Sequence, residues 1–301
     1  MLETRAFEPE YLRKLDRLVL GIKRARSVRQ GERRIGRVQG LGIELENFKE
    51  YTEGDDLRFL DWNAMARLDQ PLIRTFRAER QIEITALVDA SASMGMPTSD
   101  DKLGLGLAVG ASLAYIGMAD NDAVRLGAFS VRRGQMCLET TPFHRRRESY
   151  LNFKDFAGAV QAGGETRLGA AVDQLLLERR PRGVVVVVSD FLVSAAEAED
   201  ALKRLVAANH EVKVVHVMGE IESTGAYPPG LYRIRDAESG EMREAVFGPE
   251  AAAVCRRKVE QLVERIRAIC AAIGVVYAQA FGASTLDNFM ERELPLLGIV
   301  R

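Results

Sequence analysis

Five consecutive valines at residues 184–188 constrain the fold of this chain more than any other feature of its sequence. Successive side chains of a strand point to opposite faces of the sheet, so an unbroken β-branched run predicts a strand that is buried on both faces. Strands of this kind belong to mostly parallel sheets that helices cover on both sides. The run ends at Ser189 and Asp190, which places polar side chains at the carboxyl end of a central strand.

The sequence around the valines alternates between short apolar runs and longer amphipathic segments. The predicted strands are residues 84–88, 124–129, 184–188, 212–217 and 275–280. The predicted helices are residues 103–118, 168–177, 195–208 and roughly 250–273. Strands that alternate with helices of this length imply right-handed crossovers. We therefore expect an α/β fold with a doubly wound, mostly parallel, Rossmann-like sheet.

Three segments depart from this alternation. Residues 8–26 carry an apolar stripe of leucines and predict a helix, whereas residues 36–80 are rich in turn residues and predict irregular structure. Residues 231–235 and 243–247 flank a Glu-Ser-Gly turn and predict a β-hairpin within residues 220–248. We therefore divide the chain into an N-terminal helical and irregular segment, residues 1–80, and an α/β domain, residues 81–301, that carries the hairpin.

Two parts of the N-terminal segment are unusually charged. Residues 23–37 carry seven Lys or Arg residues against Glu32, which predicts a solvated helix end and loop, with contact to phosphate or an acidic partner as the alternative. Residues 51–67 hold many opposite charges beside Trp62 and predict a paired, partly buried network. In the plainer alternative, Asp55 caps a turn and Trp62 anchors the segment to the core.

Composition excludes several classes of protein. Lys and Arg total 42 and Asp and Glu total 43, so the chain lacks the global basic field that holds many proteins to nucleic acid. Cys137, Cys255 and Cys270 have neither a CxxC nor a zinc-type spacing, which predicts reduced thiols rather than a disulfide framework. The sequence shows no signal peptide and no run of about 18 uninterrupted apolar residues. We expect a cytoplasmic protein without a membrane span.

A constellation of polar residues follows the predicted strands. Asp89, Ser91 and Ser93 form a D-x-S-x-S pattern directly after the first strand, and alternate side chains of extended backbone point the same way. Asp190 follows the valine run, and Thr166 ends a Gly-Gly-x-Thr segment just before a predicted helix. Ligands of open α/β sheets bind beyond the carboxyl ends of the strands, so these five side chains can converge on one point.

All five offered groups are oxygens, which suit a hard divalent ion, Mg²⁺ first and Mn²⁺ or Ca²⁺ next, and do not suit zinc or copper. Two carboxylates balance the charge of the ion, and neutral hydroxyls leave it electrophilic. An open coordination position can then accept a carboxylate or a phosphate from another molecule. In the alternative interpretation, Asp89 and the serines only cap the helix that follows them.

The sequence blocks that carry this constellation resemble known families. DASAS at residues 89–93, GGETRL at 163–168 and SDF at 189–191 resemble the metal-ion-dependent adhesion site of von Willebrand factor type A domains. The segments YTEGDDLRFLDWNAMAR and FRAERQIEITALVDASASM resemble a bacterial family of unknown function, number 58 in the domain-of-unknown-function series. In that family this segment is joined to a type A-like domain. The resemblance covers most of residues 30–290.

The resemblance implies Ser91, Ser93 and Thr166 as direct metal ligands, with Asp89 and Asp190 acting directly or through water. It also implies an adaptor or chaperone partner that works beside MoxR-type AAA+ ATPases. The chain departs from many relatives in having no predicted transmembrane helix. It also has Thr166-Arg167 where related sites often have Thr-Asp, which changes the support around the threonine or the anion preference.

Three functions follow as hypotheses. The first is a non-enzymatic, metal-dependent protein-binding module, because the five side chains include no general base and no activated nucleophile. The second is a Mg²⁺-dependent phosphoester hydrolase that uses the same oxygens. The third is nucleic-acid binding through residues 23–37.

A GxGxxxG pattern at Gly104, Gly106 and Gly110 lies inside a predicted helix and indicates close packing rather than a nucleotide site. The chain also has no P-loop motif.

Overall fold

The computed structural model describes residues 5–18, 43–53, 55–78, 82–97, 99–225, 227–238, 240–281, 286–296 and 298–299. The chain forms two compact units, residues 26–81 and a larger unit made of residues 1–25 and 82–301. The N-terminal helix therefore belongs to the α/β unit, whereas our division placed it with residues 1–80. The basic run 23–37 lies outside the described residues.

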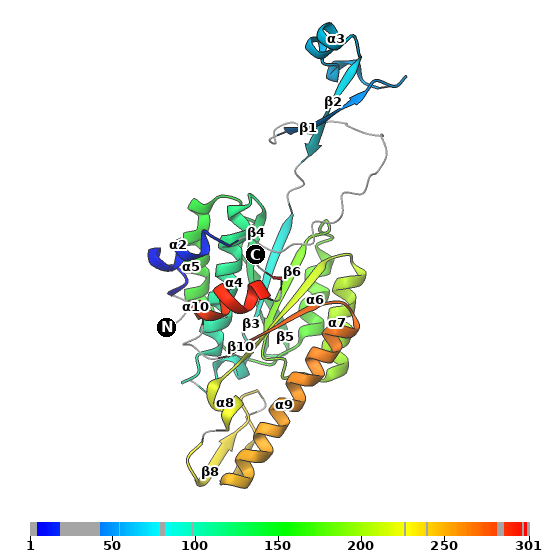
Figure 1. Ribbon diagram of the computed structural model, residues 1–301. Helices are drawn as coiled ribbons and strands as arrows, with labels where there is room; N and C mark the ends of the chain where they lie inside the picture. Colours follow the sequence, from blue (N-terminus) through cyan, green and yellow to red (C-terminus); the bar gives the residue numbers. More distant parts are fainter. Residues whose placement is uncertain are drawn as a thin grey trace. The chain divides into compact units, whose positions relative to one another are not determined.

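A six-stranded sheet forms the centre of the larger unit (Figure 1). Its strands lie in the order β10-β7-β6-β3-β4-β5, and all neighbours are parallel except β4 and β5. The strands are β3 (Glu83–Asp89), β4 (Ala123–Arg132), β5 (Gln135–Thr140), β6 (Val184–Ser189), β7 (Glu211–Met218) and β10 (Val276–Phe281). The predicted doubly wound, mostly parallel sheet is confirmed.

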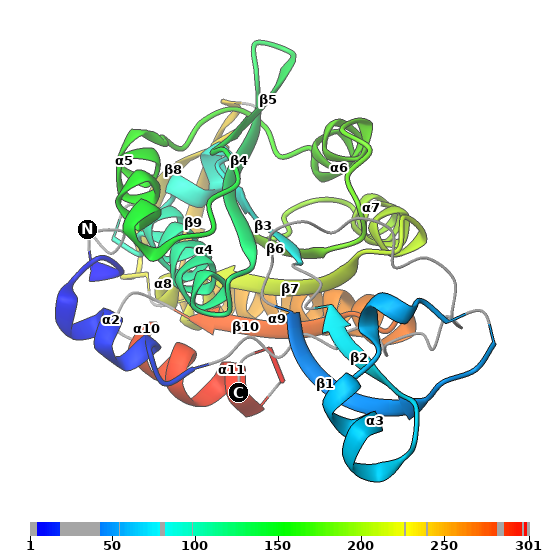
Figure 2. The same cartoon turned by 90° about the horizontal axis from the view of Figure 1, so that it is seen from above.

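Helices cover both faces of this sheet (Figure 2). On one face lie α2 (Pro9–Leu15), α4 (Lys102–Ala119), α5 (Leu151–Ala159) and the short C-terminal helices α10 (Leu286–Asn288) and α11 (Leu294–Leu296). On the other face lie α6 (Leu168–Leu177), α7 (Ala195–Ala207) and α9 (Pro249–Ala272). Val186 packs into the first layer and Val185 and Val187 into the second, so the valine run is buried on both faces as predicted.

Helix α4 is the central helix of its layer and contacts β3, β4, β6 and β7. It is long and apolar enough to cross a membrane, with a mean hydropathy of 1.4, but 89% of it is buried inside the unit, as in the core helix of an α/β fold. A Cβ on Gly110 would lie 2.9 Å from Cδ1 of Leu126. The glycines thus allow close packing of α4 on the sheet, which confirms the interpretation of the GxGxxxG pattern.

Strand β5 and helix α5 of the larger unit were not predicted, and neither were the short helices α8 (Glu220–Thr224), α10 and α11. Strand β5 pairs antiparallel with β4 at the edge of the sheet and lacks a continuous apolar run, so no periodicity marks it. Of the predicted helix over residues 8–26, α2 covers residues 9–15 and ends at Leu15, and residues 19–26 lie outside the described residues. The backbone then tightens, with the N–H of Leu18 donating to the carbonyl of Leu15.

The predicted hairpin is confirmed. Strand β8 (Gly230–Arg235) pairs antiparallel with β9 (Met242–Phe247), and α8 (Glu220–Thr224) precedes them. Most side chains of both strands are exposed to solvent.

The smaller unit is more regular than predicted. Strands β1 (Ile43–Glu50) and β2 (Leu72–Ala78) form an antiparallel pair, and α3 (Trp62–Leu68) lies between them in the chain. The side chain of Trp62 is 67% exposed, so it packs little against the rest of this unit, and the predicted network is not buried around it. The acids act locally instead: Asp61 caps α3 by accepting the N–H groups of Asn63 and Ala64, and Asp55 pairs with Lys49 at 2.7 Å.

Candidate functional site

The fold brings the carboxyl ends of β3 and β6 side by side at a topological switch point. From β3 the chain crosses to β4 on one side of the sheet, and from β6 it crosses to β7 on the other side. Crossovers that leave in opposite directions open a crevice between the two strand ends, where α/β proteins bind ligands. Asp89 is the last residue of β3, and Asp190 directly follows β6.

Asp89 is a buried carboxylate with polar partners but no cation. Its side chain is fully buried; Oδ1 accepts the N–H of Ser91 at 2.9 Å and Oδ2 accepts the hydroxyl of Ser189 at 2.7 Å. Within the described part of the chain it forms no ion pair with Lys, Arg or His. Burial, reinforced by the charge of Asp190, raises the pKa of the Asp89 carboxyl above its usual range.

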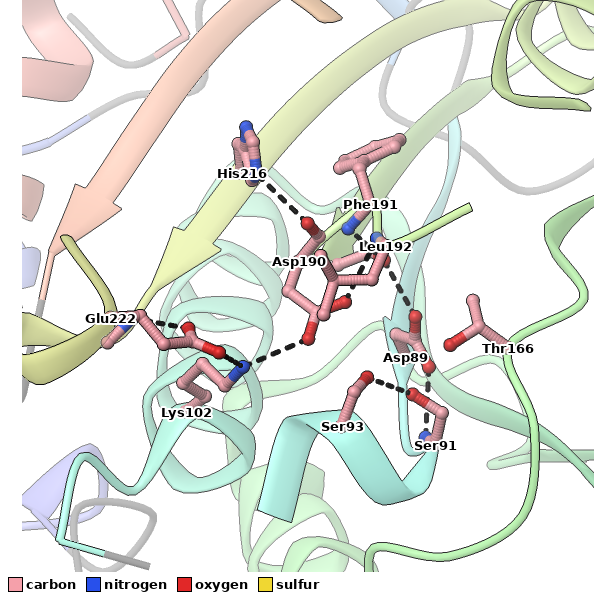
Figure 3. Close-up of polar contacts among 12 residues, drawn as sticks. Asp89, Ser91, Ser93, Lys102, Thr166, Asp190, Phe191, Leu192, His216 and Glu222 are labelled. Atoms are coloured by element: carbon pink, nitrogen blue, oxygen red, sulfur yellow. Dashed lines mark hydrogen bonds and ion pairs between the residues drawn. The ribbon is translucent and has the colours of Figure 1, made fainter. Parts of the chain in front are cut away.

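The two serines of the D-x-S-x-S pattern lie beside this carboxylate (Figure 3). Ser91 and Ser93 are both buried, and their hydroxyl oxygens are 2.9 Å apart. A short 3-10 turn, η2 (Ala92–Gly95), follows Ser91 and directs the chain toward α4. The structure brings Asp89, Ser91 and Ser93 together at one edge of the sheet as predicted, but the reason differs from the prediction. Strand β3 ends at Asp89, and the 3-10 turn, not extended backbone, places Ser93 beside Ser91.

The Thr166 loop is tied to the same edge by backbone hydrogen bonds. The N–H of Ala92 donates to the carbonyl of Gly164 at 2.9 Å, and the N–H of Gly163 donates to the carbonyl of Ala90 at 2.9 Å. These bonds hold Thr166 next to the Asp89 loop, and Figure 3 shows its hydroxyl on the side of Asp89. All five predicted side chains thus lie at one site.

Gly164 provides a test of this loop geometry. Its φ is +81°, and a Cβ there would lie 2.0 Å from the carbonyl oxygen of Val131, whereas a Cβ on Gly163 would meet only the end of Arg132 at 3.8 Å. We expect Gly164→Ala to lower the free energy of unfolding by about 1–3 kcal/mol. Gly163→Ala, the control, should change it by less than about 0.5 kcal/mol. Urea denaturation of both variants measures the difference, and equal effects would contradict the assigned backbone geometry.

A lysine that the sequence reading overlooked completes the cluster. Lys102, the first residue of α4, is 1% exposed, and its ammonium donates to Asp190 at 3.0 Å and to Glu222 at 2.9 Å (Figure 3). Burial lowers the pKa of Lys102, but the attraction of the two carboxylates outweighs it and raises the pKa overall. The signal was present in the sequence, because Lys102 is the only charged residue in an otherwise apolar helix.

His216 supports Asp190 from the next strand. Its Nε2 lies 3.0 Å from the carbonyl oxygen of Asp190, and its Nδ1 lies 2.9 Å from the hydroxyl of Tyr277. Burial lowers the pKa of His216 to about 4, so the ring is neutral at pH 7. The prediction that His216 is a satisfied core residue is confirmed.

The carboxylates of the cluster outnumber its cations in the described structure. Lys102 offsets Asp190 and Glu222, but Asp89 stays without a positive partner in the described structure. Among the described residues no three His, Cys, Asp or Glu side chains lie close enough to hold a metal together, so any metal set here combines carboxylates with hydroxyls. Asp190 uses Oδ2 for Lys102 and accepts the N–H of Leu192 with Oδ1. That arrangement suits contact with an ion through water.

Comparison with known proteins places this chain in a family. Uncharacterized protein Rv1480 of Mycobacterium tuberculosis is 30% identical over 220 residues, which cover 71% of this chain and 67% of that protein. Uncharacterized protein Mb1516 of Mycobacterium bovis matches equally well.

Solved structures with a similar fold include BatB from Bacteroides thetaiotaomicron. That protein is 16% identical, with 72% of this chain and 98% of that chain covered and a TM-score of 0.45. The SpRpn10 VWA domain is 13% identical, with 69% and 95% covered and a TM-score of 0.39. The model of the family described as "Protein of unknown function DUF58" matches residues 47–269. The chain therefore belongs to the DUF58 family, and its larger unit is an α/β domain built on a mostly parallel sheet.

Proposed function

We propose that this protein is a non-enzymatic module that binds a partner protein through a divalent metal ion. Ser91, Ser93 and Thr166 would hold the ion directly, with Asp89 and Asp190 acting directly or through water. Mg²⁺ is the first candidate, and Mn²⁺ and Ca²⁺ are the next, because the groups offered are carboxylate and hydroxyl oxygens. The ion would supply a positive, electrophilic point at the surface of the site, which accepts an acidic side chain of the partner.

The observation that carries this proposal is the buried, cation-free carboxylate of Asp89 beside two serine hydroxyls. Leaving a carboxylate ionised in such surroundings is costly unless a positive charge compensates it. The neighbouring ammonium of Lys102 is engaged by Asp190 and Glu222 instead. A divalent ion at this point would offset the charge that the described side chains leave unbalanced.

The histidine beside the cluster is not suited to act as a general base. His216, the histidine next to the cluster, is neutral at pH 7, and both of its ring nitrogens have partners in the described structure. General-base catalysis needs a group within reach of the reacting proton whose protonation state can change near the working pH. A neutral imidazole behind Asp190, with both ring nitrogens hydrogen-bonded, does not meet that requirement.

We further propose that the partner is a MoxR-type AAA+ ATPase that presents an acidic side chain.

Direct metal binding tests the proposal. We expect the purified protein to bind Mn²⁺, measured by loss of the free-ion signal in electron paramagnetic resonance, and Mg²⁺ to compete for the same site. Ser91→Ala removes one hydroxyl ligand and should weaken binding by about 10–100-fold. Ser149→Ala, in the turn η3 (Arg147–Tyr150) and outside the cluster, is the matched control. Equal Mn²⁺ affinity in the two variants would reject the assigned ligands.

The partner is tested separately. The tagged protein is incubated with native lysate in Mg²⁺ or in EDTA, and the retained proteins are identified by mass spectrometry. We expect an AAA+ ATPase in the Mg²⁺ sample that is lost both in EDTA and with the Ser91→Ala variant. Retention that is the same in all three samples would show that the metal does not mediate the contact.

A further inference from the structure

The chain places one of its own acids on the candidate site. Glu238 lies in the turn between β8 and β9, and its Oε1 accepts two hydrogen bonds from Thr166, 72 residues away in the sequence. The Thr166 hydroxyl donates at 2.9 Å and the Thr166 N–H donates at 3.2 Å. An acidic side chain of the chain itself therefore already binds Thr166, a residue that the proposed function assigns to the metal.

Both sides of this contact are held by local structure. In the hairpin turn, the N–H of Glu238 donates to Oδ1 of Asp236 at 3.1 Å, and the N–H of Gly240 donates to the carbonyl of Asp236 at 3.0 Å. Gly240 adopts a φ of +73°, which a glycine tolerates and which lets the turn reverse. On the other side, Glu165 and Val131 exchange two backbone hydrogen bonds of 2.9 Å that position Thr166.

The charges around Glu238 distinguish this contact from an ordinary surface hydrogen bond. Glu238 forms no ion pair with a cation in the described part of the chain, and the nearby charge of Asp190 acts against its own. Like charges repel each other, and in the described structure Lys102 pairs with Asp190 and not with Glu238. A divalent ion beside Thr166 would turn this repulsion into attraction for both.

The hairpin that carries Glu238 can move away at a low cost. Leu231 and Val246 are paired across the two strands, and their side chains are 74% and 75% exposed. The aromatic cluster of Tyr227, Tyr232 and Phe247 is local to the hairpin and the residues just before it, and outside the hairpin β9 contacts α9. Segments that bury few apolar side chains open locally at little free-energy cost.

We propose that Glu238 is an internal acid that occupies the acid-accepting side of the candidate metal site, so that a partner's acid binds only when the β8–β9 turn is displaced. This inference rests on the proposed function, because it assumes a metal at Thr166. Under this proposal, the β8–β9 hairpin competes with the acidic side chain of the partner for the metal site. The apparent affinity for an external acid is then reduced by the fraction of molecules in which the turn is displaced.

The test uses the full chain loaded with Mn²⁺ and glutarate as the acidic probe. Glutarate that reaches the ion displaces coordinated water, and the relaxation rate of water protons reports this. If Glu238 contacts Thr166 in about nine-tenths of the wild-type molecules, only about one-tenth can bind glutarate. Glu238→Ala should therefore bind glutarate about ten-fold more tightly than the wild type. Glu244→Ala removes an exposed acid from β9 that pairs with Arg233, and it should bind glutarate as the wild type does.

Each other outcome has a definite meaning. Glutarate affinity that is unchanged in Glu238→Ala, with Mn²⁺ still bound, would overturn this inference and leave the proposed function standing. A wild-type protein that binds no Mn²⁺ would reject the proposed function and this inference with it.

Discussion

Replacing Lys102 by methionine is expected to lower the free energy of unfolding by about 3–5 kcal/mol. The ammonium is 1% exposed and holds the carboxylates of Asp190 and Glu222. Methionine fills a similar volume but leaves Asp190 without its counter-ion in a site where water cannot replace the lost charge. Breaking a buried pair from one side costs far more than the pair itself contributes, since one charge remains unpaired.

Urea denaturation with a fitted midpoint and slope measures this effect. Lys203→Met is the matched control, because Lys203 is largely exposed and pairs with Glu199 one helical turn away. An exposed pair of this kind contributes only about 0.3–0.5 kcal/mol. Similar losses in the two variants would contradict the assignment of Lys102 as the buried counter-ion. We also expect saturating Mg²⁺ to restore part of the stability of Lys102→Met, since the ion would compensate Asp190.

Replacing Asp89 by asparagine is expected to separate folding from metal binding. Without metal, the variant should be at least as stable as the wild type, because it removes a buried charge that lacks a cation and keeps an acceptor for the Ser91 N–H. With Mg²⁺ at about 100 times its dissociation constant, the wild type should gain about 2.7 kcal/mol, and the variant should gain none.

Thermal melting with and without Mg²⁺ measures this difference. For a unit of this size the wild-type midpoint should rise by about 5–10 °C. Asp173→Asn removes an exposed acid from α6 and should retain the full Mg²⁺ response. A Mg²⁺ response in Asp89→Asn equal to that of the wild type would exclude Asp89 from the metal site, and a wild type without any response would count against the site as a whole.

The sequence determined the main layers of the fold because they depend on local periodicity. The valine run and the amphipathic helices on either side predicted a buried parallel strand and its covering layers, and the structure confirms both. Local periodicity predicted neither the weakly patterned edge strand β5 nor the end of α2 at Leu15. In an edge strand, pairing with a neighbour replaces the apolar pattern, and a helix end depends on what the next turn packs against.

The candidate site divides in the same way. The D-x-S-x-S spacing pointed to Asp89, Ser91 and Ser93 as neighbours, because residues this close in sequence at a strand end stay close in space. The extended backbone that this prediction assumed ends at Asp89, and a 3-10 turn places Ser93. Only the tertiary structure decided that Lys102 pairs with Asp190 across 88 residues and that Glu238 reaches Thr166 across 72. These contacts form because folding brings particular strand ends and turns next to each other. Residue spacing along the sequence does not encode that choice, because it arises from the packing of whole layers.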